Sequence, residues 1–176
     1  MIINNFNPTK YNGKDFNEAV ELSKGLEMRI VKAFLTHGFV ARGNDDENRF
    51  LLPSEQLVRG LDVFCFRDGF SFFVDAKDYS RLKYYSTTGI PVYLNERYKV
   101  IQKASGMKIM IFFQDHDSKT DDPVGEPYGG FMDNFIKFEK QDIPNKDGKE
   151  QIIWRCDNMK EINYFISNCL FPELFE

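Results

Sequence analysis

Asp68-Gly69 separates two runs of aromatic and β-branched residues, 61–67 and 70–76. An Asp-Gly pair in this setting predicts a β-hairpin with a two-residue type I′ turn, which needs residues that accept positive φ angles. In that register the numbers of paired residues add up to 137, as 68 and 69 do. Both faces of the two strands carry apolar side chains, so we expect the hairpin in the middle of the core.

The composition is that of a globular protein. The chain has 176 residues, of which 42% are hydrophobic and 15% aromatic, too apolar for a disordered chain. We expect one domain over residues 1–176, with a core at 24–113 and a C-terminal addition at 114–176. No apolar run approaches the roughly 20 residues of a membrane-spanning helix, and residues 1–10 lack a secretory-signal pattern. The three cysteines are widely spaced, which argues against a disulfide scaffold or a zinc finger. These features predict a cytoplasmic protein with no membrane partner.

The other elements follow from periodicity and from turn residues. The predicted order around the hairpin is a helix at 24–37 that ends at Gly38, a strand at 39–42, a loop at 43–59, a helix at 93–105 that ends at Gly106, and a strand at 107–113. An acidic loop at 114–127, strands at 135–139 and 151–155 with a turn at 147–148, and a helix from about Asn158 complete the chain. Asn158 and Glu161 occupy capping-box positions in that last helix.

The hairpin register places Asp62 directly opposite Asp75. Opposite side chains in paired strands have Cβ atoms about 5 Å apart, so two carboxylates there repel and are costly to desolvate. A divalent cation between them would compensate for this charge. Lys77 lies two residues beyond Asp75 and projects from the same face of the strand. The alternative is that the hairpin ends at this point and that both acids are solvated.

Glu27 is a further candidate because it shares a helical stripe with Val31, Phe34 and Leu35. An unpaired carboxylate is unfavourable on an apolar face, so Glu27 is expected to point toward the sheet and the two aspartates. The alternative is a glutamate that extends from the rim of the stripe into solvent near the helix N-terminus.

Glu27, Asp62 and Asp75-Ala76-Lys77, in the order helix, strand, hairpin, helix and strand, resemble the PD-(D/E)XK nuclease superfamily. The resemblance covers about residues 24–113 and is strongest to the Holliday-junction-resolvase-like branch, whose opening resembles residues 24–27 and 37–42. It implies an α/β fold: a restriction-endonuclease-like core with a mixed central sheet flanked by helices, here with a C-terminal strand and helix addition.

The resemblance also implies roles for these residues. Asp62 and Asp75 would bind Mg²⁺ or Mn²⁺ with the carbonyl of Ala76, and Glu27 would bind a second metal or one of its waters. Lys77 would orient the attacking water or neutralise the scissile phosphate. Hard oxygen ligands suit Mg²⁺, and a neighbouring cation stabilises the negative charge that develops at phosphorus.

A basic segment follows Lys77. Residues 77–108 contain seven Lys and Arg against two Asp and Glu, whereas residues 109–176 contain seven against fourteen. Cations beside aromatic rings are typical of surfaces that contact phosphates and stack on bases. The predicted nucleic-acid-binding residues are Arg42, Arg81, Lys83, Tyr84, Tyr85 and Lys99. The alternative is that these basic residues form only a solvated helix face with no binding role.

These observations predict a Mg²⁺-dependent deoxyribonuclease, with endonuclease activity expected over exonuclease activity and DNA as the partner. The residues leave open whether the protein forms a homodimer. One alternative is a module of the same fold that has lost catalysis and binds nucleic acid or protein. Another is an inhibitor domain in which the acidic segment at 109–176 mimics nucleic acid. His116, between two aspartates, is expected to be a solvated loop residue rather than a metal ligand.

Overall fold

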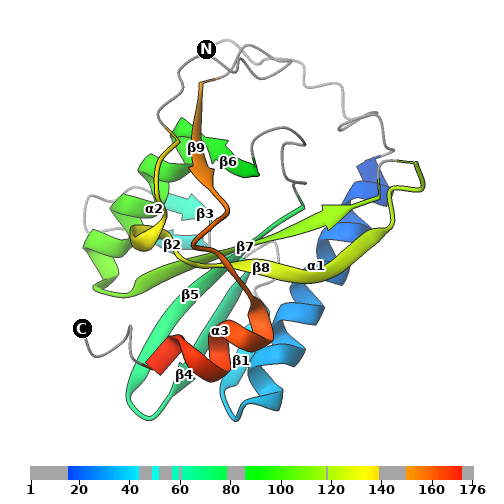
Figure 1. The fold of residues 1–176 in the computed structure, drawn as a ribbon. Helices are drawn as coiled ribbons and strands as arrows, with labels where there is room; N and C mark the ends of the chain where they lie inside the picture. The colour runs from blue at the N-terminus through cyan, green and yellow to red at the C-terminus, as the bar shows by residue number, and fades with distance from the viewer. Residues whose placement is uncertain are drawn as a thin grey trace.

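The computed structural model describes residues 16–43, 49–51, 57–59, 61–78, 86–117, 119–138 and 150–171 (Figure 1). Within these residues a six-stranded sheet has the strand order β1-β4-β5-β7-β8-β10. Its strands are β1 (Val40–Gly43), β4 (Val63–Arg67), β5 (Phe70–Lys77), β7 (Lys108–His116), β8 (Pro123–Phe131) and β10 (Lys160–Glu161). β5 and β7 are parallel, and the other neighbours are antiparallel. The predicted α/β fold with a mixed central sheet is confirmed.

β4 and β5 form the predicted hairpin in the predicted register. Val63 pairs with Val74, and Arg67 pairs with Phe70. The turn residues Asp68 and Gly69 have φ angles of 51° and 84°, as a type I′ turn requires. Because β1 flanks the hairpin on one side and β7 on the other, the hairpin lies inside the sheet and both of its edges are paired.

Helices cover the two faces of the sheet (Figure 1). The helices are α1 (Phe16–Thr36), α2 (Val92–Ser105) and α3 (Ile162–Asn168). α1 and α3 pack on the face that carries Phe72 and Val74, and α2 packs on the face that carries Phe73, since neighbouring residues of a strand point to opposite faces. No helix in the described part of the chain is long and apolar enough to cross a membrane.

The two predicted helices of the core form, but α1 begins at Phe16, eight residues before the predicted start at 24, because a helix can continue beyond its apolar stripe. α1 buries Leu26, Ile30 and Phe34, which recur at the spacing of a single helical face. The chain leaves α1 through Gly38 and α2 through Gly106, with φ angles of 80° and 70°. Glycine adopts this left-handed conformation at the lowest cost, so the sequence places each helix end correctly.

Two predicted loops contain strands instead. In the segment 43–59, β2 (Arg49–Leu51) and β3 (Leu57–Arg59) form an antiparallel pair. In the segment 114–127, β7 continues to His116 and β8 begins at Pro123, so only a short connection remains. Local polarity and the Pro and Gly residues suggested loops, but pairing with a neighbouring strand overrides these weak local preferences.

The pairing predicted for the C-terminal strands is confirmed in part. Lys137 forms an antiparallel bridge with Trp154, flanked by backbone hydrogen bonds from Arg155 to the carbonyl of Ile136 and from Phe138 to the carbonyl of Ile153. β9 (Gln151–Arg155) forms as predicted, but its full ladder is with β6 (Thr87–Pro91), a strand absent from the prediction. The turn predicted at 147–148 lies outside the described residues.

The last helix begins later than predicted. Met159, Ile162, Ile166 and Leu170 recur at helical spacing from Asn158 onward, and all four are buried. The helix starts only at Ile162, because the two residues before it pair with β8 as strand β10. The predicted capping box does not form, because no side chain caps α3. The side-chain amide of Asn158 instead donates to the backbone carbonyl of Asn134 at 2.5 Å.

Candidate active site

Asp62 reaches across the open end of the hairpin. The last pair of the ladder is Val63 with Val74, and Asp62 directly precedes it. Its Oδ2 atom accepts a 2.7 Å hydrogen bond from the backbone amide of Ala76, on the opposite strand. This bond holds the carboxylate against the strand that carries Asp75. The two acids predicted to face each other are therefore neighbours at one end of the sheet.

Asp75 is buried, with 2% of its surface exposed. Its Oδ2 atom accepts a 2.5 Å hydrogen bond from the hydroxyl of Tyr98, on α2. The same oxygen forms an ion pair with the ammonium of Lys77. The carboxylate thus points to the α2 side of the sheet, together with Lys77, as the strand alternation predicts.

The Lys77 ammonium lies among oxygen atoms of the predicted metal ligands. Besides its contact with Asp75, its Nζ atom is 3.5 Å from the carbonyl oxygen of Ala76. Burial lowers the pKa of Lys77, but the charge and hydrogen bond of Asp75 together with Tyr98 and Asp62 outweigh burial, and the net pKa is raised. Lys77 is therefore a permanent cation, and it supplies part of the charge compensation that the facing aspartates require.

The site strongly changes the protonation of Asp62. Burial raises its pKa from the usual 3.8 to about 8, and the neighbouring charges of Asp75 and Glu27 add to the effect. Lys77 and the amide of Ala76 act in the opposite direction without cancelling it. The metal-free site therefore favours the protonated form of Asp62, mainly because the carboxyl is buried.

Glu27 belongs to the same electrostatic environment. It lies on α1, is half-buried, and its charge contributes to the raised pKa of Asp62. The structure therefore brings Asp62, Asp75 and Lys77 together from a strand entry and a strand end, and Glu27 acts on Asp62 through its charge.

The donor atoms of this cluster are chemically suited to Mg²⁺ or Mn²⁺. Carboxylates and a backbone carbonyl are hard oxygen ligands, and a bound cation would take the place of the proton that the buried Asp62 otherwise holds. Among the described residues, no group of three or more His, Cys, Asp or Glu side chains is gathered closely enough to hold a metal alone. A cation would therefore have to draw on the Ala76 carbonyl and displace the Lys77 ammonium from these oxygens.

The predicted nucleic-acid-binding residues are only partly within the described residues. Arg42 is exposed on β1, and Lys99 is exposed on α2, where it forms a 3.2 Å ion pair with Glu96. The other four, Arg81, Lys83, Tyr84 and Tyr85, lie outside the described residues.

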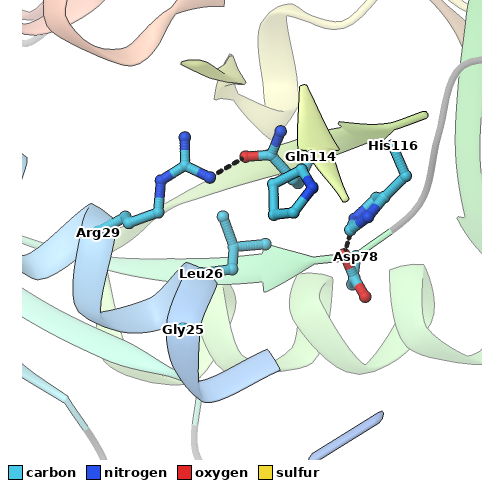
Figure 2. Close-up of a pocket in the computed structure, with 7 residues that line it drawn as sticks. Gly25, Leu26, Arg29, Asp78, Gln114 and His116 are labelled. Atoms are coloured by element: carbon cyan, nitrogen blue, oxygen red, sulfur yellow. Dashed lines mark hydrogen bonds and ion pairs between the residues drawn. The ribbon is translucent and has the colours of Figure 1, made fainter. Parts of the chain in front are cut away.

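A small pocket lies on the α1 side of the sheet, where α1 meets the ends of β5, β7 and β8 (Figure 2). Figure 2 shows Arg29 directed at Gln114, to which it donates a 2.8 Å hydrogen bond. Leu26 lies between this pair and the ion pair of His116 with Asp78. Asp75 instead contacts Tyr98 of α2, so this pocket and the Asp75–Lys77 ion pair are on opposite sides of the sheet.

His116 is not the solvated loop residue that was predicted. It ends β7, and its side chain is only 7% exposed. One ring nitrogen contacts Asp78 and the other the carbonyl of Asp121 at 2.8 Å. The prediction failed because β7 extends three residues beyond its predicted end at 113.

Sequence reasoning missed Tyr98 as a member of the site. Tyr98 shares an apolar helical stripe with Leu94 and Ile101, but nothing in that stripe indicates which strand residue meets its hydroxyl. A tyrosine in an apolar stripe does carry one signal: its hydroxyl needs a buried partner. A buried acid on a neighbouring strand is a natural partner for it.

No protein-family model and no curated protein matches the chain. Among solved structures, it is similar to a Holliday junction resolvase from Archaeoglobus fulgidus, an archaeal hyperthermophile. The TM-score is 0.55 at 10% sequence identity, and the match covers 81% of this chain and 98% of the resolvase. Likeness at this identity concerns the fold alone. The chain therefore has a fold similar to that of the resolvase, which agrees with the predicted α/β fold.

Proposed function

We propose that this protein is a metal-dependent nuclease that hydrolyses phosphodiester bonds in DNA, with Mg²⁺ or Mn²⁺ as its cofactor. The observation that carries the proposal is the convergence of Asp62, Asp75 and Lys77 at one end of the central hairpin. Two acids at one end of a buried hairpin, with an ammonium paired to one of them and a resolvase-like fold around them, form a costly arrangement for structure alone.

Each residue has a proposed role that its position supports. Asp62, Asp75 and the Ala76 carbonyl would hold the cation, and Glu27 would hold a second one or a water of the first. A bound divalent cation supplies Lewis-acid activation of water and stabilises phosphate charge. Lys77, which stays charged, would move from Asp75 to the scissile phosphate or to the attacking water.

The substrate class is proposed from the fold and from charge. The structural neighbour is a resolvase of Holliday junctions, which are branched DNA. The positive charge of residues 77–108 adjoins the candidate site in sequence and would contact phosphates. We propose DNA as the substrate, cut internally, and branched DNA is one of the forms to be tested.

The test is a cleavage assay on linear, supercoiled, single-stranded and four-way-junction DNA, with RNA alongside, in Mg²⁺, Mn²⁺ or EDTA. We expect cleavage of at least one DNA form in metal and none in EDTA. Asp75→Asn should abolish it, whereas Asp68→Asn should not, because Asp68 lies at the turn end of the same hairpin. Binding of DNA without cleavage in any metal would favour a catalytically inactive binding module.

A further inference from the structure

Tyr98 combines complete burial with a polar contact. Its side chain is 0% exposed and lies in the apolar cluster that α2 forms with the sheet. Leu94, Tyr98 and Ile101 recur at helical spacing, so the ring is held by packing on both sides along the helix. A hydroxyl in such a cluster requires a hydrogen-bond partner, and the partner here is Asp75.

Two donors from different elements meet at one oxygen of Asp75. The Tyr98 hydroxyl comes from α2 and lies 2.5 Å from Oδ2, and the Lys77 ammonium comes from β5 itself. A hydrogen bond to a carboxylate is short and strong when it is well directed. If Lys77 leaves Asp75 during the reaction, Tyr98 is the donor that still holds the carboxylate in its rotamer.

We infer that Tyr98 is a positioning residue that fixes Asp75 through Oδ2 and so presents its other oxygen, Oδ1, to the divalent cation. The inference rests on the proposed function, because the orientation of Asp75 matters to a metal only if Asp75 binds one. Groups that hydrogen-bond to a metal ligand fix its orientation, and their loss typically weakens metal binding about 10-fold to 100-fold.

The test is Mn²⁺ binding by the metal-free protein, measured by electron paramagnetic resonance titration without DNA. Tyr98→Phe keeps the ring and removes only the hydroxyl. Its matched control is Tyr128→Phe: Tyr128 is 2% exposed in the same apolar cluster, and its hydroxyl donates to Asp115 at 3.3 Å. The metal-free melting temperature of each variant is measured in parallel.

We expect the Kd for Mn²⁺ to rise about 10-fold or more in Tyr98→Phe and to stay at the wild-type value in Tyr128→Phe. The metal-free melting temperatures of both variants should fall by similar amounts, because each loses one buried hydroxyl. An unchanged or lower Kd in Tyr98→Phe would overturn the inference while leaving the proposed metal site intact. If metal-free Tyr98→Phe did not fold, the hydroxyl would be required for stability of the core, and the inference would also be overturned. If the wild-type protein bound no Mn²⁺, the proposed metal-dependent function itself would be contradicted.

Discussion

The Asp62 carboxylate accepts a 2.7 Å hydrogen bond from the amide of Ala76, which joins the entry of one hairpin strand to the exit of the other. Ala76 stands between Asp75 and Lys77, so this bond fixes the distance between the first acid and the other two charged groups. A tight Asp-Gly turn at the opposite end of the hairpin sets the register that makes it possible. The geometry of the site is thus determined largely within 16 residues of continuous sequence, from Asp62 to Lys77.

Lys77→Met should separate metal binding from cleavage. The ammonium contacts Asp75 and lies 3.5 Å from the Ala76 carbonyl, two of the proposed ligands, so it competes with a cation for them. We expect Mn²⁺ affinity to be unchanged or higher and the cleavage rate to fall about 100-fold or more. Calorimetry and single-turnover cleavage measure the two effects.

The matched control for Lys77→Met is Lys108→Met. Lys108 is also a partly buried strand lysine, and its ammonium lies over the ring of Phe131. Lys108 begins β7, whereas Lys77 pairs with Phe113 near the other end of that strand. Lys108→Met should leave both the Mn²⁺ affinity and the cleavage rate unchanged. Weaker Mn²⁺ binding in Lys77→Met would show that Lys77 does not compete with the cation.

Asp75→Asn should reduce both metal binding and cleavage. Asparagine retains the size of the side chain but not its negative charge, and the ion pair with Lys77 is lost. We expect a fall in cleavage rate of about 100-fold or more, together with weaker Mn²⁺ binding. Retention of full activity in Asp75→Asn, with Asp68→Asn as reference, would rule out Asp75 as a ligand.

The metal-free protein should lose stability relative to Asp62→Asn as the pH rises. The pKa of Asp62 is raised to about 8 in the folded protein, against 3.8 as its ordinary value. A raised carboxyl pKa means that the folded state binds this proton more tightly than the unfolded state does. The resulting stabilisation is complete below about pH 4 and is lost as the pH approaches 8.

Melting temperatures of wild type and Asp62→Asn in EDTA, taken from pH 5 to about pH 8, test this sign. The wild-type value should fall relative to the variant across that range, and Mg²⁺ should restore it most strongly at the upper end, where Asp62 has lost its proton. A difference between the two proteins that is constant with pH would contradict the raised pKa of Asp62.

DNA binding should weaken steeply with salt if phosphate contacts provide most of the affinity. Raising the salt from about 50 mM to about 200 mM should reduce binding, and Arg42→Gln should lower the slope of log Kd against log salt by about one. Lys137→Gln, an exposed lysine outside the predicted surface, serves as the control. Fluorescence anisotropy with labelled DNA measures these slopes. Equal slopes in Arg42→Gln and wild type would show that Arg42 does not contact DNA phosphates.

The central hairpin was predictable because its information is local. Asp68-Gly69 determines the turn, and the alternation of side chains then places Asp62, Asp75 and Lys77. The helices of the core were also predictable, since each has one apolar stripe and a glycine at its end.

Elements that depend on distant partners were not predictable in the same way. β8 contains Pro123, Gly129 and Gly130, which locally indicate a turn, yet it pairs along β7. A Cβ at Gly129 would lie 1.9 Å from the carbonyl oxygen of Ile111, so the glycine there permits close approach of two strands. The Tyr98 contact with Asp75 likewise joins residues 23 positions apart and depends on how α2 packs.

The measurement that tests the site most directly is anomalous diffraction from a crystal of the protein soaked in Mn²⁺. We predict an anomalous peak at roughly 2.0–2.3 Å from carboxylate oxygens of both Asp62 and Asp75, with the Lys77 ammonium moved away from Asp75. A fully soaked crystal with no peak between these two aspartates, and with Lys77 still paired to Asp75, would contradict the proposed metal-dependent nuclease.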